Sequence, residues 1–128
     1  MIRYLTTEQV LRIHRKMLER YGGAVGVRDP ALLESAVVRP RLSAFGKDAY
    51  PTLFRKAAVL LHSLVKNHPF VDGNKRTGFA AMHLMLLLNG YDVTSTTVQE
   101  VSMTLHVAEG KTVPEQIESW IEKYGKER

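Results

Sequence analysis

The chain has 128 residues, 45% of them hydrophobic and 24% charged, which is enough to bury one core but short for two domains. It contains no cysteine, which excludes disulfides and thiolate metal sites and is typical of a reducing cytoplasm. The net charge is +5 at pH 7, and the longest apolar run, residues 79–88, is about half of a membrane span. We expect a single intracellular domain covering residues 1–128, with no membrane partner.

The N-terminal segment predicts a helix from Thr6 to the Gly22-Gly23 pair. Thr6 and Gln9 have the spacing of a capping box, and apolar residues then recur at helical intervals. His14 lies beside this apolar stripe, where we expect a partly buried packing residue with no chemical role. The segment also carries a basic cluster, formed by Arg12, Arg15, Lys16 and Arg20. It is either a solvated helix face or a docking surface for an acidic partner or nucleic acid.

The second predicted helix is short. Asp29 and Pro30 are typical of an N-cap and a first helical residue, and Pro40 ends the helix. Residues 21–28, just before it, are rich in glycine but lack the spacing of a phosphate-binding loop, so we interpret them as a structural turn. Residues 41–51, just after it, have no helical period. They predict either a surface loop held by two aromatic side chains or a flap that lines up a protein substrate beside the active site.

A third, central helix is predicted from Thr52 to Asn67. Its apolar residues recur at helical steps, and the cations Arg55, Lys56 and Lys66 are expected on the opposite, solvent side. A fourth helix, ending at the Asn89-Gly90 pair, is apolar almost all the way round. That pattern is typical of a helix buried among other helices.

Two further helices are predicted to close the chain. Two T-x-x-E patterns place their N-caps at Thr97 and Thr112, and the helices end near Ala108 and Tyr124. Six helices with at most a short β-hairpin make the predicted fold class all-α, a compact six-helix bundle.

The segment from His68 to Thr77, H-P-F-V-D-G-N-K-R-T, is the one stretch whose composition is not explained by packing. It leads directly into the apolar fourth helix, whose N-terminus has unpaired N–H groups and the positive end of the helix dipole. Such a loop is suited to hold an anion, and phosphate is the anion we expect. Lys75 and Arg76 would neutralise its charge, Gly73 would allow close approach of the backbone, and Asn74 would cap the helix or donate to a phosphate oxygen.

Two residues of this segment predict chemistry beyond binding. Asp72 is repelled by bare phosphate, so its presence favours a bridging Mg²⁺. His68, whose side chain titrates near neutrality, is the candidate base toward an attacking hydroxyl. Together they indicate a phosphoryl- or nucleotidyl-transfer site. In the alternative interpretation the loop is merely polar, Asp72 pairs with Arg76, and His68 caps the third helix.

Residues 68–76 resemble the signature H-x-F-x-[D/E]-G-N-G-R of Fic-domain proteins. The chain is most similar to the death-on-curing (Doc) toxin branch, which also has Y-G-G near residue 21, R-D-P before the second helix and L-N-G-Y after the motif. The resemblance implies an all-helical fold with ATP and Mg²⁺ as cofactors. It also implies the site residues: His68, Asp72, Lys75 and Arg76 as catalytic residues, Gly73, Asn74, Lys75 and Arg76 around ATP, and Asp72 as the metal ligand.

Two departures from the Fic signature bear on the reaction. Lys75 stands where most Fic proteins have glycine, and Phe79 stands where they have a second arginine that binds phosphate. Doc-like toxins share the lysine. The resemblance therefore implies transfer of the γ-phosphate to a threonine of elongation factor Tu, which arrests translation. AMP transfer to protein, and a non-enzymatic module that binds the translation machinery or nucleic acid, are the alternatives.

The resemblance also implies a partner that restrains the toxin. Self-inhibiting Fic proteins carry [S/T]-x-x-x-E-[G/N], and here the nearest match, Thr96 to Glu100, is followed by Val101. We therefore expect inhibition in trans by a cognate antitoxin that folds into a groove of this domain. The other expected partner is the protein substrate, and direct binding of nucleic acid is not expected.

Overall fold

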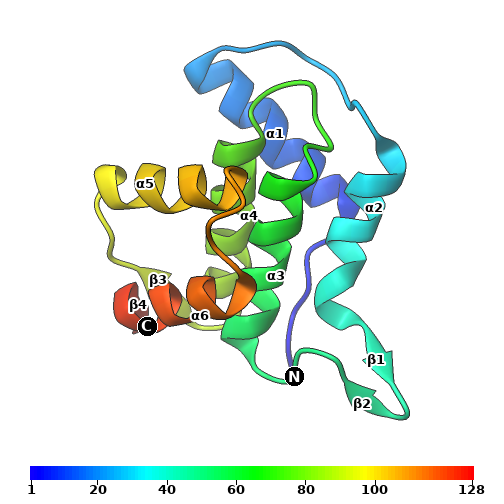
Figure 1. Cartoon of the computed structure of the whole chain (residues 1–128), viewed down its shortest axis with the longest axis vertical. Coiled ribbons are helices and arrows are strands. Elements are labelled where there is room, and N and C mark those ends of the chain that lie inside the picture. Colours follow the sequence, from blue (N-terminus) through cyan, green and yellow to red (C-terminus); the bar gives the residue numbers. More distant parts are fainter.

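The computed structural model describes all 128 residues and consists of six α-helices with short connecting elements (Figure 1). The helices are α1 (Thr7–Tyr21), α2 (Pro30–Val38), α3 (Leu53–Lys66), α4 (Asn74–Leu88), α5 (Thr97–Ala108) and α6 (Pro114–Tyr124), and a 3₁₀ turn, η1 (Arg39–Arg41), follows α2. The strands form two antiparallel pairs, β1 (Ser43–Ala44) with β2 (Lys47–Asp48) and β3 (Tyr91–Val93) with β4 (Gly125–Glu127). The all-α prediction is confirmed. The sequence did not predict the β3–β4 pair.

The centre of the bundle is the α3–α4 pair (Figure 1). Nine of the fourteen residues of α3 are buried, and this helix contacts α2, α4, α5 and α6. Gly78 lies where α4 packs tightly against α3, because a Cβ added there would be 2.6 Å from Cγ2 of Val65. No helix is both long and apolar enough to cross a membrane.

Local capping explains where most helices begin. Thr6 and Gln9 form the predicted capping box of α1, while Asp29 and Thr52 accept N–H bonds as the N-caps of α2 and α3. The last two caps were predicted one residue away from their actual positions. Helix α5 is capped by Thr96 with Gln99 instead of Thr97, because glutamine serves as the reciprocal partner as well as glutamate does.

At α6 the N-cap is Val113 instead of Thr112. Pro114 favours the first helical position, which makes the residue before it the cap. The side chain of Gln116 accepts the bond from Val113 N–H at 2.9 Å.

The prediction that Lys56 lies on the solvent side of α3 is wrong. Its side chain is 1% exposed, and its Nζ donates to Asp48 Oδ2 at 3.0 Å and to the carbonyl oxygen of Pro40 at 3.2 Å. Burial alone would lower the pKa of Lys56, but bonding to Asp48 and Tyr4 outweighs it and raises the pKa, so the amine stays charged. The ion pair between buried Lys56 and the exposed Asp48 fastens the β1–β2 hairpin to the first turn of α3.

Candidate functional site

The polar motif forms a tight loop, residues 67–73, that joins α3 to α4 at one end of the bundle; we call it the motif loop (Figure 1). Asn67 is the C-cap of α3, and His68 follows with φ 49°, in the left-handed region that non-glycine residues rarely adopt. Pro69 and Phe70 are then buried, and Gly73 (φ 79°) begins α4. The loop therefore turns sharply twice within six residues.

Asn74 holds the motif loop from the helix side. Its side chain is buried, where Oδ1 accepts from Phe70 N–H at 3.0 Å and Nδ2 donates to the Phe70 carbonyl oxygen at 3.0 Å. These two bonds fix which end of the amide is which. Nδ2 therefore donates to Nδ1 of His68, at 3.2 Å. The N-cap is Gly73, whereas Asn74 was one expected candidate. Asn74 acts on the loop through its side chain, and its backbone N–H precedes the first intrahelical bond.

His14 holds the same loop from α1, which the sequence reasoning missed. It was expected to be a packing residue without a role, yet Nε2 lies 2.8 Å from the Asp72 carbonyl oxygen and the ring stacks on Phe70 at 3.8 Å between centroids. The side chain is 4% exposed. The sequence did contain a signal for this role: a histidine on a buried helix face needs a hydrogen-bond partner, because buried polar groups are rarely left without one.

The Asp72 carboxylate lies at the mouth of the site. Its Oδ2 accepts from Ala24 N–H at 3.1 Å and its Oδ1 from Gly73 N–H at 2.8 Å. These two bonds, with smaller contributions from Lys75 and His14, lower the pKa of Asp72, so the group is ionised at neutral pH. The alternative pairing with Arg76 is wrong, because the structure contains no ion pair between the two.

Residues 22–29 lie over the motif loop; we call them the covering loop (Figure 1). Val27 forms an antiparallel bridge with Phe70, Val71 N–H donates to Gly26 at 3.0 Å, and the N–H groups of Arg28 and Asp29 both donate to the Pro69 carbonyl oxygen. The guanidinium of Arg28 also donates to the carbonyl oxygens of His68 and Asn67, at 2.6 and 2.8 Å. The segment interpreted as a structural turn is thus part of the site.

The flap interpretation of residues 41–51 is wrong in its location. They do form a hairpin, but Asp48 fixes it to the first turn of α3. His68 follows the last turn, and the ten helical steps from Lys56 to Lys66 span about 15 Å. The hairpin and the motif loop lie at opposite ends of α3 (Figure 1), and the covering loop is the segment beside the site.

The two motif cations lie in the first turn of α4 with exposed side chains. The guanidinium of Arg76 lies 4.1 Å from the ring centroid of Tyr21, at the end of α1. Thr77 N–H makes the first backbone bond of the helix, to Gly73 at 2.9 Å, so the N–H groups of residues 74–76 precede the intrahelical ladder. The structure therefore brings all six predicted site residues to one loop and one helix end.

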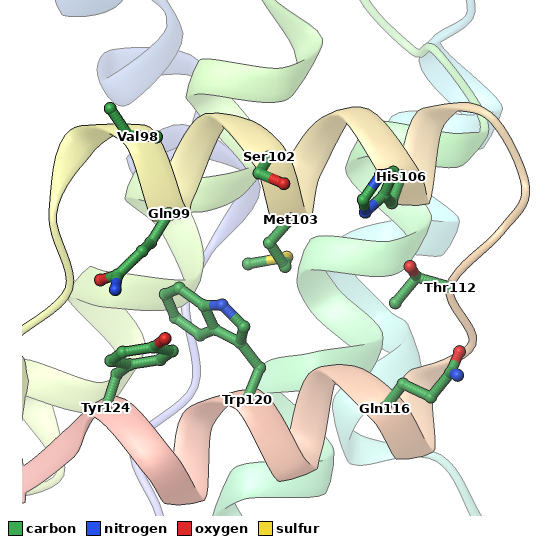
Figure 2. Close-up of a pocket in the computed structure, with 9 residues that line it drawn as sticks. All are labelled: Val98, Gln99, Ser102, Met103, His106, Thr112, Gln116, Trp120 and Tyr124. Carbon is green, nitrogen blue, oxygen red and sulfur yellow. The ribbon is translucent and has the colours of Figure 1, made fainter.

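A separate groove lies between α5 and α6, with a volume of about 380 Å³ (Figure 2). Met103 and Trp120 face each other across it, and Tyr124 closes one end. Its lining contains no carboxylate and no residue of the motif. The chemistry predicted from the sequence therefore has no counterpart in this groove. The basic cluster on α1 is exposed and forms no ion pair, which leaves both of its interpretations open.

Fold and site together define a small helical protein in which a clamped polar loop opens onto the N-terminus of a buried helix. A family model described as "Fic/DOC family" matches residues 4–86. One relative, "Toxin Doc" of Mycolicibacterium smegmatis, is 49% identical over 90 residues, which are 70% of this chain and 67% of the relative. Another, "Protein kinase doc" of Escherichia phage P1, is 30% identical over 92 residues, 72% of each chain. The chain belongs to the Fic/DOC family.

Proposed function

We propose that this protein is the toxin of a toxin–antitoxin pair and acts in the cytoplasm as an ATP- and Mg²⁺-dependent phosphotransferase. Its substrate is a threonine hydroxyl of a protein, elongation factor Tu, and the modification arrests translation. The names of the two relatives, a toxin and a protein kinase, support the general class. Transfer of phosphate in place of AMP is inferred from Lys75 and Phe79.

The observation that carries the proposal is the packing of Phe79. Its ring is half-buried and meets Trp120 of α6 edge-on, with the ring centroids 5.8 Å apart. The position one turn after the motif cations is therefore part of the α4–α6 contact and supplies no phosphate ligand. Lys75, exposed in the first turn of α4, adds a charge where a glycine would leave space. Both differences favour an ATP pose unlike that of AMP-transferring Fic proteins.

The residues present fit Mg²⁺ and ATP. Each oxygen of Asp72 accepts one backbone bond and keeps a free lone pair, the group is exposed, and its lowered pKa keeps it charged, as a magnesium ligand requires. When bound, the nucleotide would supply the phosphoryl group and the metal would neutralise part of its charge. The free N–H groups at the head of α4, with Lys75 and Arg76, would hold the phosphate oxygens.

His68 receives the proton of the substrate hydroxyl. In the resting arrangement its Nδ1 accepts from Asn74, so the neutral ring carries its proton on Nε2. To take another proton, the ring must release Asn74 and turn a nitrogen lone pair to the substrate, and its exposed position permits this rotation. Asn74 thus holds the His68 ring in an ordered orientation in which it cannot accept the substrate proton.

The test uses ATP labelled at the α- or the γ-phosphate, with purified elongation factor Tu and Mg²⁺. We expect label from γ-labelled ATP alone, and none with His68→Ala. A double variant, Lys75→Gly with Phe79→Arg, should move transfer toward the α-label. If the unmodified protein incorporates only the α-label, the reaction is AMP transfer and the phosphotransfer proposal is wrong.

Restraint of this toxin is proposed to come from a cognate antitoxin in trans. The internal glutamate nearest to an inhibitory pattern, Glu100, accepts a bond from Ser95 Oγ at 3.1 Å in the first turn of α5. It forms no ion pair with Lys75 or Arg76. Expression of the chain alone should arrest growth, and co-expression of a separately encoded antitoxin should relieve the arrest. If no co-expressed protein relieves the growth arrest, this part of the proposal is contradicted.

A further inference from the structure

A buried histidine outside the motif makes its closest polar contact with the backbone of the motif loop. His14 Nε2 lies 2.8 Å from the Asp72 carbonyl oxygen, and the imidazole lies flat on the Phe70 ring, 3.8 Å away and 7° from parallel. A Cβ added at Gly73 would be 3.6 Å from the same imidazole. One side chain of α1 therefore contacts the loop at Phe70 and at the Asp72 carbonyl group and lies close beside Gly73.

The bond from His14 acts on the peptide that joins Asp72 to Gly73. The carbonyl group of this peptide accepts from His14, and its N–H donates to Asp72 Oδ1 at 2.8 Å. A peptide is planar and its C=O and N–H point in opposite directions, so fixing one fixes the other. A rotation that broke the bond to His14 would also take the Gly73 N–H away from the carboxylate. The bond that Asp72 Oδ1 accepts and the left-handed turn at Gly73 thus depend on one peptide plane, while Ala24 N–H holds the other carboxylate oxygen.

We propose that His14 is a positioning residue of this site, which orients the Asp72 carboxylate and the head of α4 by holding the peptide between Asp72 and Gly73. The metal-binding part of this inference rests on the proposed function, whereas the orientation of the carboxylate does not. His14 touches no reacting atom. It acts through Asp72, in the way that outer partners orient metal ligands.

Three substitutions separate the hydrogen bond from packing. His14→Phe keeps a flat ring against Phe70 but has no donor. His14→Gln keeps an N–H at a similar reach but has no ring. Val10→Ala, one turn earlier on α1 and fully buried, removes packing but no hydrogen bond to the loop and serves as the control for lost stability.

The first readout is the pKa of the Asp72 carboxyl group, titrated by NMR in the ligand-free protein. We expect His14→Phe to raise it toward the ordinary value near 3.9, and His14→Gln and Val10→Ala to leave it low. The second readout is calorimetric ATP binding as a function of Mg²⁺. The Mg²⁺ concentration for half-maximal binding should rise roughly tenfold or more in His14→Phe, the range seen when the support of a metal ligand is removed.

An unchanged Asp72 titration in His14→Phe would overturn the inference, as would an equal change in Val10→Ala, which would assign the effect to packing. Should the unmodified protein bind no ATP, the proposed function fails while the titration still decides the role of His14. If His14→Phe does not fold, His14→Gln remains decisive, because loss of the low pKa in a variant that keeps the donor would contradict the role of the hydrogen bond.

Discussion

His68 has a backbone conformation that costs free energy, and this cost can be measured. At φ 49° an L-residue is about 1–2 kcal/mol less favourable than glycine. Glycine has more conformational entropy to lose on folding, which offsets about 0.4–1 kcal/mol of that difference. His68→Gly should therefore be more stable than His68→Ala by about 0.5–1 kcal/mol. Both variants lose the imidazole and its bond to Asn74, so those losses cancel in the comparison.

Urea unfolding followed by circular dichroism measures the difference, and a thermal scan should show a midpoint about 2–4 °C higher for His68→Gly at this chain length. Neither variant should transfer phosphate. The matched control is Asn67, one residue earlier with φ −87°, where glycine should be less stable than alanine. Equal stability of His68→Gly and His68→Ala would refute the strain argument and indicate that the loop relaxes freely once the imidazole is gone.

Further predictions concern the clamp, the helix contact and the carboxylate. Asn74→Ala leaves both polar backbone groups of Phe70 buried without partners, which should destabilise the protein by about 2–4 kcal/mol in urea unfolding; a change below 0.5 kcal/mol would show that water replaces the amide. Gly78→Ala places a Cβ 2.6 Å from a valine methyl group of α3 and should cost about 1–3 kcal/mol by the same assay, unlike a Gly→Ala change at an open helix surface. Asp72 has a lowered pKa, caused first by its bond from Ala24 N–H, so its stabilising contribution is present above the unfolded pKa near 3.9 and lost as pH falls through the folded pKa. Between pH 5 and 3 the unmodified protein should therefore lose more stability than Asp72→Asn, and equal losses would contradict the assignment.

The helices were predictable because their signals are local. A cap and its partner are three residues apart, as in Thr6 with Gln9, and the apolar period that follows reports which face is buried. Errors of one residue arose where two neighbouring patterns competed, as at Thr96. The site residues were recognisable because they are consecutive in the chain, so composition alone drew attention to them.

The parts that sequence reasoning missed depend on contacts between distant segments. His14 and Asp72 are 58 positions apart, and no periodicity relates them. The burial of Lys56 depends on the hairpin that folds over it. The covering loop was assigned no role because its glycines match no binding pattern, although backbone bonds to the motif loop are what those residues form. In each case a partner supplied by the tertiary fold decided the role of the residue.

The β3–β4 pair has a practical consequence for handling the protein. It ties the last residues of the chain to the segment just after α4, where Arg128 N–H donates to the Gly90 carbonyl oxygen at 2.9 Å. The first residues are held nearby, because Arg3 exchanges bonds with Asn89. Both ends thus lie about one length of α4, roughly 22 Å, from the motif loop (Figure 1). An affinity tag or fluorescent label joined to either end would leave the mouth of the site open to a macromolecular substrate.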